Sequence, residues 1–252
     1  MRTFALLGAS GALLLTALLA CSSTPEQPLD DRTGEETDAG PQRDGSTYDS
    51  QVSPESGLGE LLFRPDKIFT GTDGTHTFRV PLAVYDSADD LTVTASDPSG
   101  VTVAKTTLTN PVNPDGVTDN GKYFLVTAKK AGTYTLTATS KGRSTTATVT
   151  ITSYDASRYA AGQARYAATG TGADRPCTTC HGSVGGIDHS PAALGTATDQ
   201  EVGIIITTGV KPGPSIIKIT SEPGTMHKWN VTDPEKDGLI TYLRGLDPKG
   251  FQ

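Results

Sequence analysis

The residues with the clearest potential for chemistry are two cysteines and a histidine in the last hundred residues of the chain. Cys177, Cys180 and His181 form the pattern C-x-x-C-H, with two residues between the thiols and an imidazole directly after the second thiol. Two thiols at this spacing can act as a dithiol redox pair, can provide half of a zinc site, or can attach covalently to a haem. The surrounding sequence must decide among these three chemistries.

Two of the three interpretations lack their usual context. A dithiol redox pair sits at the start of a helix in a βαβ pattern, which this sequence does not show. A zinc site needs a second pair of ligands, and His189 and His227 are 38 residues apart, which is not finger spacing. Covalent haem attachment needs two thiols that reach the two vinyl groups of one porphyrin and an imidazole beneath the iron. We therefore predict one haem c, bound through Cys177 and Cys180, with His181 as an axial iron ligand.

The sixth iron ligand is predicted to be Met226. It is the only methionine apart from Met1, and it follows His181 by 45 residues. His227 is the alternative, because neighbouring residues in an extended segment point in opposite directions. His189 and an open or water-bound iron are further options. An iron held by imidazole and thioether has no vacant position, which predicts one-electron transfer; a labile or open sixth position would instead predict a haem enzyme or sensor.

The elements that must position these residues are predicted to be helices. Tyr159, Gly162 and Tyr166 fall on one face of a helix that opens near Asp155. A second helix is expected over 198–208. A third follows Thr232, where Thr232 and Glu235 have capping-box spacing and the apolar stripe ends before Pro248.

These features together resemble class I mono-haem c-type cytochromes over residues 154–252. Gly162 and Tyr166 match the family's G-x-x-x-Y before C-x-x-C-H, and Thr232, Glu235 and ITYLRGL match its last helix. The resemblance implies an all-α cytochrome c domain in which the first and last helices cross, with Gly162 close to Tyr242. It also implies an axial Met226 and an electron carrier, not an enzyme, that exchanges electrons with redox partner proteins.

Residues 60–153 are predicted to form an antiparallel β-sandwich. Alternating runs such as residues 133–139 and 146–151 indicate strands, and Asn-Gly, Asp-Gly and Lys-Gly pairs indicate the turns between them. The stretch AGTYTLTATSKGRSTTATVTI resembles the final hairpin of bacterial immunoglobulin-like domains, with Tyr134 as the corner tyrosine. The expected fold class is therefore multidomain, an all-β Ig-like sandwich followed by an all-α domain. A spacer role is favoured for the sandwich over surface adhesion.

The N-terminus is predicted to direct export and membrane attachment. Residues 1–20 read as a signal peptide, and Leu18-Leu19-Ala20-Cys21 resembles a bacterial lipobox, so that Cys21 becomes the lipidated first residue. An uncleaved transmembrane helix is the alternative, but the apolar stretch is short for a span. Residues 21–59 are predicted to be a disordered acidic tether. Ser22 favours the outer membrane, by resemblance to the sorting rule for such lipoproteins.

The charge distribution excludes one class of partner. The net charge is -7, and the excess of acidic residues lies in residues 22–60, which contain ten acids and two arginines. Residues 61–252 contain 18 acids and 18 bases. A neutral folded part gives no electrostatic basis for binding nucleic acid. The sequence also contains no GxGxxG, GxxxxGK[ST], HExxH or GxSxG motif, which argues against a dehydrogenase or hydrolase.

Overall fold

The computed structural model of the protein describes residues 61–86, 90–109, 119–168, 175–181, 188–211, 217 and 227–252. The predicted signal peptide, Cys21, the tether over 21–59 and Met226 lie outside these residues. Among the helices in the described part of the chain, none combines the length and the apolar character needed to cross a membrane.

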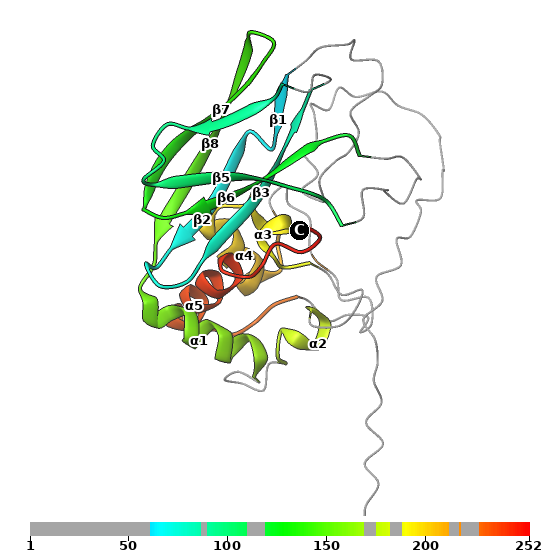
Figure 1. Cartoon of the computed structure of the whole chain (residues 1–252). Coiled ribbons are helices and arrows are strands. Elements are labelled where there is room, and N and C mark those ends of the chain that lie inside the picture. The colour runs from blue at the N-terminus through cyan, green and yellow to red at the C-terminus, as the bar shows by residue number, and fades with distance from the viewer. Residues whose placement is uncertain are drawn as a thin grey trace, which may run out of the picture.

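Strands account for most of the regular structure between residues 61 and 153, as the alternation of side chains predicted. They form two four-stranded sheets, ordered β1-β3-β6-β5 and β2-β8-β7-β4 (Figure 1). Only β2 and β8 pair in parallel among the described strands. The strands are β1 (Leu62–Arg64), β2 (Lys67–Thr72), β3 (Phe78–Tyr85), β4 (Thr92–Ala95), β5 (Val101–Thr106), β6 (Lys122–Ala128), β7 (Gly132–Ser140) and β8 (Arg143–Ser153).

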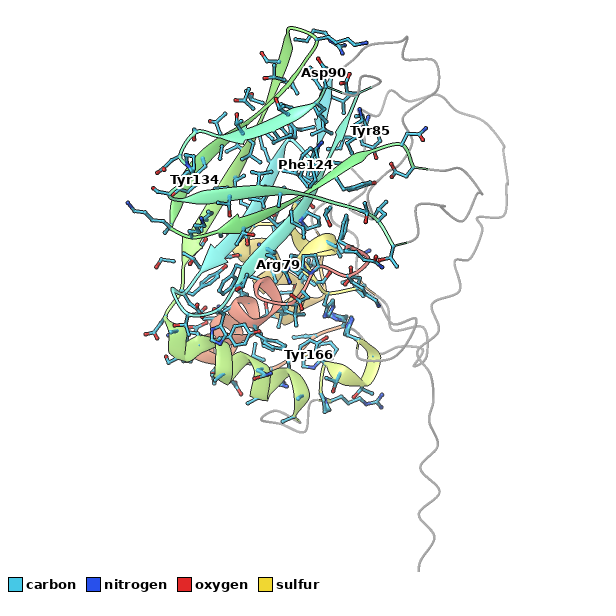
Figure 2. The ribbon with its side chains drawn as sticks, in the orientation of Figure 1. Arg79, Tyr85, Asp90, Phe124, Tyr134 and Tyr166 are labelled. Atoms are coloured by element: carbon cyan, nitrogen blue, oxygen red, sulfur yellow. The ribbon has the colours of Figure 1, made fainter. Side chains whose placement is uncertain are left out.

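The two sheets enclose an apolar core. Along β7 every second residue from Tyr134 to Ser140 is buried, and the residues between them are more exposed, as expected for a strand with one buried face. The Tyr134 hydroxyl donates to the carbonyl of Lys130 at 3.0 Å and so closes the turn before β7. Figure 2 places Tyr134 and Phe124 in the sheets and Tyr166 among the helices.

Five helices follow in the described residues: α1 (Ala156–Ala167), α2 (Thr178–His181), α3 (Pro191–Leu194), α4 (Asp199–Thr208) and α5 (Asp233–Arg244). Their starts are set by side chains that accept backbone hydrogen bonds. Asp155 caps α1, and α4 and α5 begin with the capping boxes Thr198–Glu201 and Thr232–Glu235. The predicted starts of α1, α4 and α5 are confirmed.

Helices α1 and α5 cross in close contact at two glycines. A Cβ atom on Gly162 would lie 1.8 Å from the carbonyl oxygen of Gly238, so only glycine fits there. The prediction that Gly162 lies opposite Tyr242 is therefore wrong, because the residue opposite Gly162 is Gly238. The ring of Tyr242 instead packs against Tyr159 and Tyr166, with centroids 5.3 Å away in both cases.

The helices lie against one end of the sheets, beneath β2 and β3 in Figure 1, and bond directly to them. Arg244 of α5 donates to the carbonyl of Phe69 in β2 at 3.1 Å. The N–H of Phe69 donates in turn to the carbonyl of Gly195, which ends α3, at 2.7 Å. Near the C-terminus, Leu108 and Phe251 form an antiparallel bridge. The chain thus returns to the strands after its last helix.

The predicted fold class, a β-sandwich followed by a separate all-α domain, is wrong. The described residues form a two-sheet, β-rich unit to which a few short helices are joined. The core of the sheets and the core of the helices share Tyr154 at their boundary. Helical periodicity in the sequence locates α1, α4 and α5 but neither α2 nor α3, and it does not show which surface covers the buried face of a helix.

Candidate cofactor site

The C-x-x-C-H residues lie on one tight turn. Cys177 directly precedes α2, and its carbonyl accepts hydrogen bonds from the N–H groups of Cys180 at 3.3 Å and His181 at 3.1 Å. Residues three and four positions apart on a helical turn project from the same side. The turn therefore presents both thiols and the imidazole in one direction, and both cysteines are free of disulfide bonds.

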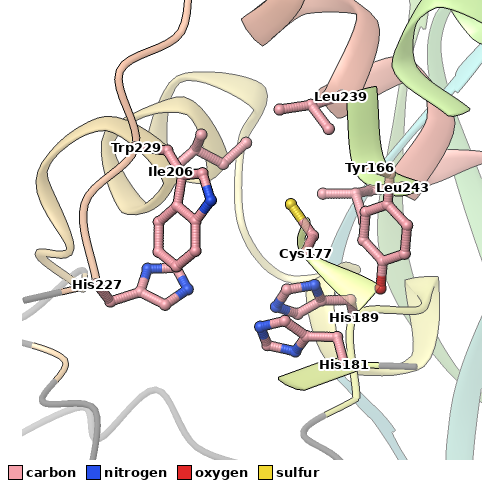
Figure 3. Close-up of a pocket in the computed structure, with 9 residues that line it drawn as sticks. All are labelled: Tyr166, Cys177, His181, His189, Ile206, His227, Trp229, Leu239 and Leu243. Atoms are coloured by element: carbon pink, nitrogen blue, oxygen red, sulfur yellow. The ribbon is translucent and has the colours of Figure 1, made fainter. Parts of the chain in front are cut away.

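This turn opens onto a pocket walled by the helices (Figure 3). Apolar side chains from α4 and α5 form one part of the wall, and aromatic and imidazole rings form the rest. Figure 3 shows His227 and Trp229 on one side and His181, His189 and Tyr166 on the other, with the sulfur of Cys177 between them. The lining residues are Tyr166, Cys177, His181, His189, Ile206, His227, Trp229, Leu239 and Leu243.

Three imidazoles meet in the pocket although they are far apart in the sequence. His181, His189 and His227 each offer a ring nitrogen, and these atoms lie within 4.8 Å of one another. The rings of His181 and His189 are stacked, with centroids 3.2 Å apart and planes 25° apart. The ring of His227 is nearly perpendicular to that of His181, with centroids 6.1 Å apart and planes at 88°.

The electrostatics of the pocket favour neutral imidazoles. Burial holds the pKa of His189 well below its usual range, and the nearby His181 and His227 act in the same direction. Burial also lowers the pKa of His227, against backbone hydrogen bonds at Ile205 and at His227 itself. The Nδ1 atoms of His189 and His227 are buried without a hydrogen-bond partner in the described structure. A neutral imidazole has a lone pair to give to a metal.

The thiol of Cys177 is likewise kept neutral. Burial raises its pKa, and the nearby Arg165 opposes that rise only in part. A neutral, partly buried thiol that faces an apolar pocket is placed to react with an apolar group inside it. The reactive dithiol of a redox enzyme has the opposite property, a lowered thiol pKa.

Trp229 fixes the segment before α5 to the residues before Cys177. Its indole Nε1 donates to the carbonyl of Arg175 at 2.9 Å, and its ring packs 4.5 Å from that of His227. Trp229 lines the pocket. The contact with Arg175 had no signal in the sequence.

The apolar wall was not named in the sequence prediction of the site. Leu239 and Leu243 are one turn apart on the buried stripe of α5, so helical periodicity did contain this signal. His189 precedes the short helix α3 in an irregular segment, and no periodicity places it against His181. Met226, the predicted sixth ligand, and Cys21, the predicted lipidation site, lie outside the described residues.

The three imidazoles and two thiols could hold either a divalent metal ion or a haem. Three imidazoles suit a divalent transition-metal ion as well as a haem iron, and the sequence argument against zinc, based on spacing alone, overlooked this proximity. The three imidazoles could hold a bare ion without the apolar wall, and thiols at this spacing are also zinc ligands. A porphyrin would in addition use the apolar wall and both thiols, and the buried Nδ1 of His227 has no partner in the described structure. The residues present therefore fit a haem.

Comparison with known proteins adds no family. No family model matches the chain, and no curated protein matches it. Among solved structures, the crystal structure of the S-layer protein SbsC domains 4 and 5 is similar over 39% of this chain and 49% of that chain, with 14% sequence identity and a TM-score of 0.23.

The predicted resemblance to a class I mono-haem cytochrome domain preceded by an Ig-like domain is corrected by these findings. No family model of either kind matches, and the described fold is a β-rich unit with two sheets and short attached helices. The matched residues belong to helix caps, an apolar stripe and one five-residue motif. Capping boxes and apolar stripes recur in helices of any fold, so they do not establish a family.

Proposed function

We propose that the protein binds one haem covalently through Cys177 and Cys180, with His181 as an axial ligand, and that it transfers single electrons. One observation supports this most directly: the C-x-x-C-H turn opens onto a pocket that has an apolar wall and further imidazoles opposite and beside His181. A haem supplies reversible one-electron chemistry when bound. The proposal depends on these local residues and not on family membership.

Each side chain has a defined part. Cys177 and Cys180 would hold a haem as two thioethers, since addition of each S–H across a vinyl C=C would form one C–S and one C–H bond without an oxidant or a leaving group. His181 would hold the iron through a ring nitrogen. Ile206, Leu239 and Leu243 keep water away from the site, because each presents only hydrocarbon to the pocket. With a second side chain on the iron, a bound haem would supply one-electron transfer and would not bind oxygen or peroxide.

The export and anchoring predictions complete this proposal. We infer from the sequence that residues 1–20 are removed and that Cys21 carries the lipid that holds the chain to the membrane, with the outer membrane favoured by Ser22. Residues 21–59 would then separate the haem site from the bilayer. The electron donor and acceptor are redox partner proteins, met in brief encounters that bury little surface.

The experiment is expression of the full chain in an exporting host that has a covalent haem attachment system. We expect a coloured protein that retains one haem under denaturing mass spectrometry. Cys177→Ala and Cys180→Ala should each lose one thioether bond, and the double variant should lose haem on denaturation. Cys21→Ala is the matched control, since it removes a cysteine but should keep the haem. A colourless wild-type protein under these conditions disproves the proposal.

Measurements on the same expressed protein distinguish the alternative functions. A haem enzyme or sensor requires an open or labile sixth position, so rapid binding of cyanide or peroxide would favour it. A surface adhesin with an accessory haem would bind a surface through residues 61–153 and keep that binding when the double cysteine variant has lost its haem.

A further inference from the structure

The pocket offers two imidazoles besides His181, and their orientations differ. We propose that His227 is the second axial ligand, so that the iron is held by two imidazoles; this rests on the haem site proposed above. Met226, the neighbouring residue favoured by the sequence, then has no bond to the iron. The identity of the second ligand would determine the redox potential of the bound haem.

The separation of His181 and His227 suits two ligands on opposite sides of one metal. Two metal–imidazole bonds of about 2.0–2.1 Å place two opposed nitrogens about 4 Å apart, and the ring radii bring the centroids to about 6.3 Å. The observed centroid separation is 6.1 Å, and the planes are at 88°. One ring nitrogen of His181 and one of His227 lie within 4.8 Å of each other, close to the separation of two opposed ligands.

His189 does not satisfy the same condition. Its ring is stacked on that of His181, with centroids 3.2 Å apart, so it lies beside the proximal ligand and not opposite it. Stacked rings direct their in-plane nitrogens side by side, whereas opposed axial ligands must face each other across the metal. Figure 3 shows the same arrangement, with His189 next to His181 and His227 across the pocket.

The backbone of the His227 segment is held from several sides. Trp229 N–H donates to the carbonyl of Ile206 at 3.0 Å, and the indole of Trp229 packs on the His227 ring. Gly209 ends α4 with a φ of 70°, and a Cβ there would lie 2.2 Å from the His227 carbonyl oxygen. Close packing against a left-handed glycine leaves this segment little freedom.

The His227 ring also has the support that metal-bound imidazoles require. The His227 ring donates one hydrogen bond to the backbone of Ile205, and its Nδ1 is buried without a partner in the described structure. An imidazole that binds a metal through one nitrogen commonly uses the other to donate to a backbone carbonyl, which fixes the ring orientation. His227 therefore has one ring nitrogen available and a hydrogen bond that can orient it.

The spectrum of the unaltered, haem-loaded protein is the first test. We expect the oxidised protein to be low-spin and to lack the weak long-wavelength charge-transfer band of sulfur-ligated iron, and Met226→Leu should leave this spectrum and the redox potential unchanged. The presence of that band, together with its loss in Met226→Leu, would overturn the proposal.

Variants of His227 provide the complementary test. His227→Ala should open the iron, so that cyanide associates faster than with the wild-type protein. His227→Met should introduce the sulfur band and raise the potential, because thioether ligation raises it. His189→Ala is the matched control and should keep the low-spin spectrum; conversion to high spin would assign the ligand to His189 instead.

The two proposals fail in different ways. A haem-loaded chain whose sixth ligand is sulfur or His189 overturns the assignment of His227 and leaves covalent haem binding intact. A chain that carries no covalent haem overturns both proposals. Haem content from the denaturing mass measurement is therefore recorded for each variant before its spectrum is interpreted.

Discussion

The guanidinium of Arg244 donates a hydrogen bond from Nε to a carboxylate oxygen of Asp199 across 3.0 Å. Asp199 accepts another from the Tyr154 hydroxyl at 2.8 Å. The Arg244 residue is only 1% exposed, and its other N–H groups reach the carbonyls of Phe69 and Leu194. One buried cation thus joins β2, the end of α3, the start of α4 and the end of α5, which together form one side of the helical core that carries the pocket.

Removal of this cation should destabilise the protein strongly. Arg244→Met removes the guanidinium donor of the Asp199 carboxylate and of three backbone carbonyls, those of Phe69, Leu194 and Ala197. We expect the free energy of unfolding to fall by about 3 kcal/mol, the lower end for a broken buried ion pair, because the Asp199 side chain is 26% exposed. Chemical denaturation, monitored by circular dichroism, measures this loss of unfolding free energy.

Arg158→Met is the matched control for this change. Arg158 forms an ion pair with Asp237 at 3.6 Å, but both side chains are substantially exposed. Such pairs contribute about 0–1 kcal/mol. Equal losses in the two variants would contradict the role assigned to Arg244.

Local features of this fold were predictable from the sequence, whereas contacts between distant segments were not. The alternation Thr133–Thr139 gave a strand, and Thr232 with Glu235 gave a helix start, because each pattern depends on neighbours within a few residues. The bond from Arg244 to Phe69 joins residues 175 positions apart. No local pattern contains such a partner, and for this reason the helices were predicted to be a separate domain.

The candidate site likewise has a local motif that the sequence shows and contacts between distant segments that it does not show. The C-x-x-C-H motif from Cys177 to His181 consists of five consecutive residues and is visible in the sequence, although its helical turn was not predicted. The approach of His189 and His227 to His181 depends on how α4 and α5 pack, and the sequence spacing of 38 residues between the two gave no sign of it.

Gly162 should be intolerant of any side chain. A Cβ at this position would overlap the Gly238 carbonyl, which belongs to the backbone of α5 and cannot rotate away. Gly162→Ala should therefore cost about 1–3 kcal/mol of unfolding free energy through overpacking, although alanine favours helices. Thermal unfolding of the haem-loaded protein measures this loss.

Gly203→Ala in α4 is the control for Gly162→Ala. A Cβ there would lie 3.4 Å from the flexible side chain of Lys236, an ordinary contact. We expect no loss of stability, or a gain of up to about 1 kcal/mol from helix propensity. Equal effects of the two substitutions, or a gain of stability for Gly162→Ala, would refute the close crossing of α1 and α5.

The stability of α1 should depend on acid pH through Asp155. The carboxylate accepts hydrogen bonds from the Ser157 N–H and then from its hydroxyl, and these hold the pKa of Asp155 below its usual value of 3.8. The folded carboxyl is thus more acidic than the unfolded one. Its contribution is fully present above the unfolded pKa and is lost as pH falls through the lower folded pKa.

Asp155→Asn isolates this effect, because asparagine keeps the acceptor oxygen but does not titrate in this range. We expect the wild type to exceed Asp155→Asn in unfolding free energy at about pH 6, and the difference to vanish below the folded pKa. Ser157→Ala, which removes the hydroxyl donor, should reduce the pH-dependent part. Denaturant titrations at a series of pH values measure the difference in unfolding free energy between the wild type and Asp155→Asn. A difference that is constant across pH would argue against the lowered pKa of Asp155.

The helical segment should not fold on its own as well as it does beside the sheets. Residues 154–252 alone lose the bond between Phe69 and Gly195, the bond from Arg244 to Phe69, and the contact of the Tyr159 ring with Phe78. Without haem, we expect residues 61–252 to unfold in one cooperative transition and residues 154–252 to show a broad, low-temperature transition or none. Residues 61–153, which keep both sheets and the larger apolar core, are the control and should unfold cooperatively. A sharp transition of residues 154–252 at the same temperature as the longer chain would show that the contacts across the junction contribute little to stability.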